Sequence, residues 1–212
     1  MQRRKFTSLV IIVPVTGLPG VASAGLFSET DAVAGVRTAL ERGATSAVAL
    51  LGRTDGFLGN PKVRIELPGF LKDAAKLLKA TGQGKRVDEL VTAMNRAAEA
   101  AVPEAKAMLI SAVKAMSVED ASKIVKGGET SVTQFFTTKT REPLSGKFLP
   151  IVERATEKVS LAKKYDAVAA KAAGLGLMKK EEANLNGYVT GKALDGLYFM
   201  IGEEEKKIRK DP

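Results

Sequence analysis

Cysteine, histidine and tryptophan are all absent from this chain of 212 residues. Without cysteine there is no disulfide, no thiolate nucleophile and no thiolate metal ligand. Without histidine the chain lacks the usual general base near neutral pH and the commonest ligand of transition metals, and a Ser-His-Asp triad is excluded. The composition therefore excludes thiolate and imidazole metal sites, and it leaves only carboxylate or lysine chemistry to an enzyme. We expect no metal site and no cofactor, since an oxygen-only Ca²⁺ site needs about six ligands and only Asp55 and Asn60 stand out as candidates.

Aromatic residues are scarce, at 5% of the chain, although the formal net charge is +9. A nucleic-acid groove needs clustered Lys and Arg together with aromatic side chains on which bases can stack. Here the positive charges are interspersed with acidic residues, which is typical of a solvated surface. We therefore expect no nucleic-acid partner, whereas attraction to anionic lipid head groups is compatible with the charge.

The N-terminus has the pattern of a secretory signal peptide, which we assign to residues 1–24. Positive residues Arg3–Lys5 precede an apolar run, Phe6–Val15, and Ala22-Ser23-Ala24 is a small-x-small cleavage sequence. The run is shorter than the roughly 20 residues that span a bilayer; an uncleaved anchor or a buried first helix is the alternative. We expect cleavage after Ala24 and a periplasmic or secreted mature domain, residues 25–212, without a transmembrane segment.

Apolar residues recur at helical spacing through most of the mature domain. The clearest stripe lies in residues 87–101, and Pro103 separates it from a second stripe in residues 105–116. Ser117 with Asp120 predicts the N-cap of another helix. These patterns favour a helical domain, since strands would require apolar residues at every second position.

The C-terminal half continues this pattern with more interruptions. Pro143 and Pro150 are expected to break the apolar segment in which they lie. Gly187 and Gly191 form a small-xxx-small pair, which predicts close packing of two helices inside a soluble fold. No internal repeat and no domain linker is apparent. The predicted fold is one all-α domain of about seven or eight helices.

Residues 52–69 differ from the rest, because their glycines and prolines exclude a helix. Val63, Ile65 and Leu67 alternate with charged residues, which indicates an extended segment with one buried side. Three interpretations remain open. The segment is a loop packed on the helices, a lid over a pocket, or a lone edge strand that pairs with a partner.

A polar row accompanies the apolar stripe of residues 87–101. Asp88, Thr92, Asn95 and Glu99 recur at i, i+4, i+7 and i+11 along the flank of this predicted helix. A row at the edge of the core can line a cleft, or it can form hydrogen bonds with a neighbouring loop.

Several sequence blocks together carry a family resemblance. They are Asp55-Gly-Phe-Leu-Gly-Asn-Pro61, Met94-Asn-Arg-Ala-Ala-Glu-Ala-Ala-Val-Pro-Glu-Ala-Lys106, Phe148-Leu-Pro-Ile-Val, Tyr188-Val-Thr-x-Lys-Ala-Leu-Asp-Gly-Leu197 and Glu203-Glu-Glu-Lys-x-Ile-Arg209. With these blocks the chain resembles the bacterial envelope proteins grouped as domain of unknown function 4197. The resemblance covers essentially the whole mature chain. It implies an exported helical domain and supplies no established catalytic residue.

The first functional hypothesis is a soluble periplasmic binding protein with a cleft between helices. Arg96 would hold an anionic head group, and Ala and Met side chains would accept an apolar tail. The partner would be a lipid-like small molecule. The predicted ligand-binding residues come from the central helix and from the loop that faces it: Asn95, Arg96, Glu99, Asp55, Phe57 and Asn60.

Two other functions remain as alternatives. In a non-catalytic structural or interaction protein of the envelope, the same polar residues would pin the loop, and a partner protein would bind a surface such as Lys62–Leu67. In an enzyme, Glu99 with Asp88 or Asp55 would be the paired carboxylates.

Overall fold

The computed structural model describes residues 29–82, 84–157, 163, 165–166, 174 and 184–210. The predicted signal peptide lies outside these residues, as does most of residues 158–183. Within the described part every regular element is helical and no strand occurs, so the all-α class is confirmed. The total of seven or eight helices stays a prediction, because part of the chain is not described.

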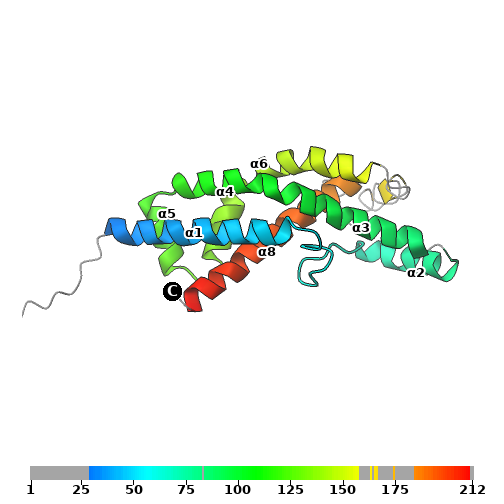
Figure 1. The fold of residues 1–212 in the computed structure, drawn as a ribbon, viewed down its shortest axis with the longest axis horizontal. Coiled ribbons are helices and arrows are strands. Elements are labelled where there is room, and N and C mark those ends of the chain that lie inside the picture. Colours follow the sequence, from blue (N-terminus) through cyan, green and yellow to red (C-terminus); the bar gives the residue numbers. More distant parts are fainter. Residues whose placement is uncertain are drawn as a thin grey trace, which may run out of the picture.

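The helices form an elongated assembly (Figure 1). In chain order the elements are α1 (Glu29–Leu51), the 3₁₀ turn η1 (Gly69–Leu71), α2 (Lys72–Ala80), α3 (Gly84–Ala101), the 3₁₀ turn η2 (Val102–Glu104), α4 (Ala105–Lys114), α5 (Val118–Lys126), α6 (Ser131–Thr156) and α8 (Leu185–Lys210). Helix α8 runs diagonally across the assembly and contacts α1, α3 and α6. It is therefore the element around which the core is built.

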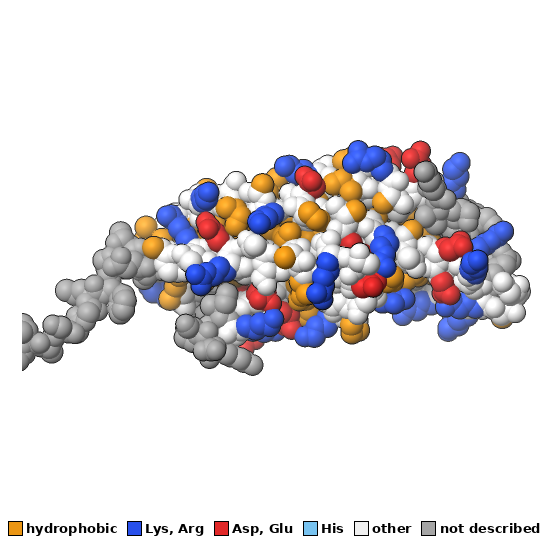
Figure 2. Space-filling model, in the orientation of Figure 1, with side chains coloured by type: hydrophobic (Ala, Val, Ile, Leu, Met, Phe, Trp, Pro, Cys, Tyr) orange, Lys and Arg blue, Asp and Glu red, His pale blue; other side chains and the backbone are white. Residues whose placement is uncertain are grey.

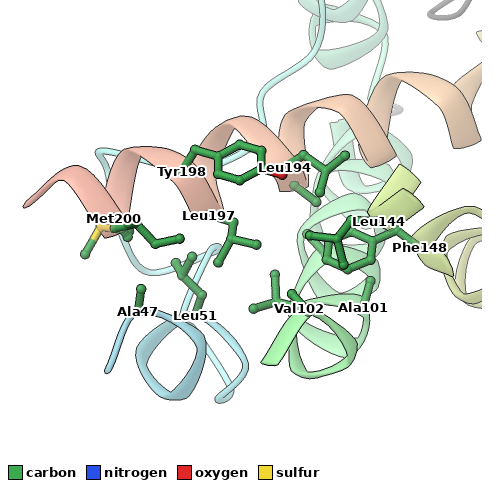
Figure 3. Close-up of a cluster of buried hydrophobic side chains, with 14 of the residues drawn as sticks. Ala47, Leu51, Ala101, Val102, Leu144, Phe148, Leu194, Leu197, Tyr198 and Met200 are labelled. Atoms are coloured by element: carbon green, nitrogen blue, oxygen red, sulfur yellow. The ribbon is translucent and has the colours of Figure 1, made fainter. Parts of the chain in front are cut away.

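The core is assembled from segments that are far apart in sequence. Leu144 and Phe148 of α6 are completely buried, and so are Leu51 of α1 and Leu197 of α8. Figure 3 shows these side chains meeting between the helices. Their stripes are compatible with helical periodicity, so each helix buries one face and leaves the opposite face to solvent.

Pro103 interrupts the helical ladder as predicted. Helix α3 ends at Ala101, the turn η2 carries the proline, and α4 begins at Ala105. Proline lacks the backbone N–H that an α-helix needs at an interior position, so the chain tightens into a 3₁₀ turn before it continues. The predicted N-cap of α5 is also present. The Ser117 hydroxyl accepts from the Asp120 N–H at 3.0 Å, and the Asp120 carboxylate accepts from the Ser117 N–H at 3.2 Å.

The expected break of α6 at its prolines is wrong. Helix α6 continues from Ser131 to Thr156 through both Pro143 and Pro150. Both prolines are on the exposed face, and so are Lys139 and Gly146, whose carbonyl groups lose their helical donors. Water can satisfy these carbonyls, while the buried face of α6 keeps its packing.

The predicted close packing at the Gly187–Gly191 pair is not present at Gly191. A Cβ atom at Gly191 would meet nothing within 4 Å. The close approach on this helix is at Gly196 instead, where a Cβ would lie 2.7 Å from Cε1 of Phe57. Spacing along one helix identifies small residues but not which of them faces a neighbour.

Candidate functional site

The glycine-rich segment of residues 52–68 is a loop packed on the helices. It leaves α1 at Leu51 and passes over α3 and α8 before η1 (Figure 1). Val63 and Ile65 are buried, as the alternation predicted, and Phe57 is completely buried although it lies in a loop. The loop thus contributes to the core, which supports the packed-loop interpretation over a lid or an edge strand.

Asn95 holds the extended part of this loop. Its Oδ1 accepts from the Ile65 N–H at 2.8 Å, and its Nδ2 donates to the Ile65 carbonyl at 2.9 Å. The same Nδ2 donates to the Val91 carbonyl in α3 at 2.8 Å. The side-chain amide therefore pairs with Ile65 as a neighbouring strand would, inside the core.

Glu99 and Arg96 hold the glycine-rich part. Oε1 of Glu99 accepts from the backbone N–H groups of Phe57 and Leu58, at 3.0 and 3.1 Å. Oε2 accepts from Arg96 Nη1 at 2.6 Å, and Arg96 Nη2 contacts Asp55 Oδ1 at 2.8 Å. The pKa of Arg96 is raised above its ordinary value, mainly by the hydrogen bond to Glu99 and next by the hydrogen bond to Asp55. We name Asn95, Arg96, Glu99 and Asp55 the loop clamp.

Local geometry explains the glycines beside the clamp. Asp55 adopts a φ of +64°, which starts the tight turn. A Cβ at Gly56 would lie 2.4 Å from the carbonyl oxygen of Leu51, so no other residue fits there without a backbone shift. Asn60 Oδ1 accepts from the Lys62 N–H at 3.1 Å, and its backbone carbonyl accepts from Val63 and Arg64. Asn60 is thus a turn residue.

The structure brings all six predicted site residues into one region. Their hydrogen bonds run between α3, the loop and α8. Ligand binding by these six residues stays a prediction. The pairing of Asn95 with the loop is the arrangement expected if the polar row pins the loop rather than lining a cleft.

The carboxylates considered for catalysis are engaged in other contacts. Asp88 pairs with Lys79 at 3.1 Å on α2, while Arg96 bridges Asp55 and Glu99. General acid–base catalysis by paired carboxylates requires two groups that face a shared substrate position. The guanidinium of Arg96 occupies the space between Asp55 and Glu99. Nor do the described residues contain a cluster of three or more acidic side chains suited to a metal ion.

A second region is hollowed and apolar. A pocket with a cavity volume of about 190 Å³ lies between α1, α5, the start of α6 and the end of α8. We name it the α1–α8 pocket. Its lining consists of Val36, Ala39, Leu40, Gly43, Ala44, Ile124, Val125, Val132, Ile201 and Glu205.

The pocket exists because one face of α1 is small. Ala39, Gly43 and Ala44 lie within two turns of this helix, where larger side chains would fill the space. Val125 at the rim has 56% of its surface exposed, so the apolar lining continues to the outside. Close packing is the default for protein interiors. An apolar hollow of this size between four helices is therefore a candidate binding site.

Glu205 is the one ionisable side chain of the pocket lining within the described part of the chain. It is only 5% exposed, and its Oε1 contacts the Ser131 hydroxyl at 3.3 Å. Glu205 was not among the predicted site residues, because Glu203–Lys207 has the composition of a charged, solvated helix end. The available signal was its position four residues after Ile201, on the apolar face of α8.

The face of the molecule seen in Figure 2 has mixed charge. Figure 2 shows Lys and Arg side chains spread along one face among apolar and acidic groups. Among the described helices, none is both long and apolar enough to cross a membrane.

Comparison with known proteins places the chain at the level of a family. The family model described as "Protein of unknown function (DUF4197)" matches residues 26–212. The chain belongs to this family. The resemblance noted in the sequence is thereby confirmed. Neither a curated protein nor a solved structure matches the chain.

Proposed function

We propose that this family member is a non-catalytic binding protein for a small apolar or amphipathic molecule, held in the α1–α8 pocket. The observation that carries the proposal is an apolar hollow of about 190 Å³ with a single buried carboxylate in its lining. Ligand pockets are typically apolar with few polar groups that orient the ligand. The lining of the α1–α8 pocket is apolar apart from Glu205, so it fits this description.

The volume limits what the pocket accepts. Pockets for drug-sized molecules range from about 300 to 1,000 Å³, whereas an apolar cavity of about 150 Å³ holds benzene. The α1–α8 pocket therefore suits a body of about six to eight carbon atoms, by comparison with that cavity. A longer ligand would extend past Val125 into solvent.

This proposal places the ligand in a different region from the residues that the sequence predicted to bind it. Asn95 and Glu99 direct their polar atoms at loop backbone, and Phe57 fills the space against Gly196. We assign these residues to holding the loop. The proposed function is still the binding of a small molecule, as in the sequence-based hypothesis. The proposed binding site is now the α1–α8 pocket.

We also propose that the protein works in the periplasm or outside the cell. Support comes from the positive start, the short apolar run and the Ala22-Ser23-Ala24 sequence, and from the family match that begins at residue 26. The envelope is where a carrier would meet lipid-like molecules.

An interaction protein that uses Lys62–Leu67 as an edge strand is less well supported. The N–H groups of Val63 and Arg64 bond to Asn60, both polar groups of Ile65 bond to Asn95, and the Glu66 carbonyl accepts from Tyr188. Strand addition needs a row of available backbone groups. The backbone groups named above already form hydrogen bonds within the protein, so they are not available to a partner strand.

Native mass spectrometry of protein purified without detergent tests the binding function. We expect a small-molecule adduct that organic extraction removes. The Ala39→Leu substitution places a larger side chain in the pocket and should abolish the adduct. Ala49→Leu makes the same change on the exposed side of α1 and should retain it. A bare wild-type mass, together with failure to bind any short-chain amphiphile, would refute the proposal.

A further inference from the structure

The side of the α1–α8 pocket that α1 provides is a straight groove. Val36, Leu40 and Ala44 recur every four residues, and Ala39 and Gly43 form the neighbouring row at the same spacing. Rows of this spacing run close to the direction of a helix axis, so the groove between them follows α1. The second row carries at most one methyl group per residue, which leaves the groove open along its length.

The pocket is long for its volume. Between Val36 and Ala44, which both line it, the helix advances by about 12 Å. Its volume of about 190 Å³ is little more than the roughly 150 Å³ of an apolar cavity that holds the compact ring of benzene. A hollow of similar volume that extends over this length is narrow. Its shape therefore fits an extended hydrocarbon chain better than a ring.

The groove is closed at one end and open at the other. Ala44 is only 1% exposed and Leu40 is 6% exposed, whereas Val36 and Ala39 are half-buried. A chain that enters from solvent thus reaches Ala44 last. Moving a polar group into the apolar groove would cost its hydration, so the polar end of an amphiphile stays at the open end.

We infer that the α1–α8 pocket binds an unbranched alkyl chain lengthwise along α1, with the terminal methyl group against Ala44. This inference rests on the proposed function and names the ligand class of the same pocket. An extended alkyl chain advances by about 1.3 Å per carbon atom, given C–C bonds of about 1.5 Å. About eight carbon atoms therefore cover most of the groove. The pocket recognises the shape of the hydrocarbon part of its ligand.

Two neutral isomers, octan-1-ol and the branched 2-propylpentan-1-ol, test the shape of the ligand. Their binding to the wild-type protein is measured by isothermal titration calorimetry at neutral pH. We expect octan-1-ol to bind at least about tenfold more tightly, because the branch keeps about two methylene groups out of the groove. Equal affinities of the two isomers would overturn the inference.

Chain length tests where the alkyl chain ends. In the wild type, octan-1-ol should bind about tenfold more tightly than hexan-1-ol, since about two more methylene groups are buried. Ala44→Val fills the closed end, so it should retain hexan-1-ol and reduce this gain to less than about twofold. Ala49→Val makes the same change on the exposed side of α1 and should keep the tenfold gain. An undiminished gain in Ala44→Val would show that the chain does not end at Ala44.

The outcomes separate the two proposals. If none of the three alcohols binds to the wild type, the proposed binding function fails. If they bind and the two isomers are equal, the binding function stands and the inferred unbranched chain is wrong. Circular dichroism verifies that each variant is folded. The comparison of the isomers uses the wild type alone, so it tests the inference even if Ala44→Val does not fold.

Discussion

At the scale of single residues, the loop clamp shows how one buried side chain holds a segment that is distant in sequence. Asn95 is completely buried and makes three hydrogen bonds to backbone groups. Its position in the polar row was evident from the sequence, but its partner was not. Ile65 is 30 residues away along the chain, and helical periodicity says nothing about contacts at that distance.

The substitution Asn95→Ala should destabilise the protein. It leaves the N–H and carbonyl of Ile65 buried without a partner, which costs about 1–3 kcal/mol in the free energy of unfolding. Urea denaturation measures the change. Thr92→Ala, on the exposed side of the same helix, should alter stability by less than about 0.5 kcal/mol. Equal effects of the two substitutions would show that the clamp does not hold the loop.

The capping box of α5 predicts a pH dependence. The Ser117 N–H bonds to the Asp120 carboxylate and lowers the pKa of Asp120 below its ordinary 3.8. A carboxyl group whose pKa is lowered by folding stabilises the folded state above the unfolded pKa. This contribution is lost as the pH falls through the folded pKa.

We therefore expect Asp120→Asn to be less stable than the wild type at neutral pH. The difference in urea midpoint should narrow once the pH falls below 3.8. A difference that stays constant down to acidic pH would argue against a role for the charged carboxylate. Glu129→Gln, an exposed acid in the segment that follows α5, serves as the control for general charge effects.

At the scale of elements, sequence periodicity located most described helices. The stripes of α3 and α4 and the cap of α5 agree with the structure, because these signals depend on neighbours one turn away. The prediction that Pro143 and Pro150 break α6 was wrong. Their effect depends on whether the released carbonyl groups reach water, and that is decided by which face of α6 the rest of the protein covers.

The glycines of α8 offer a matched pair of tests at this scale. Gly196→Ala brings a Cβ to 2.7 Å from the Phe57 ring and should destabilise the protein by about 1–3 kcal/mol through overpacking. Gly191→Ala meets nothing within 4 Å and should stabilise it by about 0.5–1 kcal/mol, since alanine favours the helix. Thermal unfolding of both variants provides the measurement. A stabilising Gly196→Ala would mean that the loop can move away from α8.

At the scale of the whole molecule, α8 and the loop join distant parts of the chain into one core. Phe57 meets Glu99 and Gly196, and Lys62 pairs with Glu203 at 2.6 Å. The α1–α8 pocket likewise combines residues from four helices. Each lining residue belongs to an ordinary apolar stripe, apart from Glu205 and the small residues of α1.

The proposed export of the protein leads to a prediction about the N-terminus of the mature chain. Protein recovered from the periplasm should begin at Gly25, because Ala22-Ser23-Ala24 fits the cleavage sequence. N-terminal sequencing and intact mass provide the measurement. Ala24→Arg should block cleavage and leave residues 1–24 attached. Recovery of the wild type from the cytoplasm with an intact N-terminus would contradict export.

The sequence by itself determined the helical class and the family, and it singled out the residues of the loop clamp as candidate site residues without deciding their role. These follow from local spacing and from motifs, which one-dimensional order preserves. Only the tertiary structure decided that Asn95 and Glu99 bind loop backbone, that Gly196 rather than Gly191 is closely packed, and that Glu205 is buried in an apolar pocket. The physical reason is that burial and hydrogen-bond partners depend on which helix faces meet, and those faces belong to segments far apart along the chain.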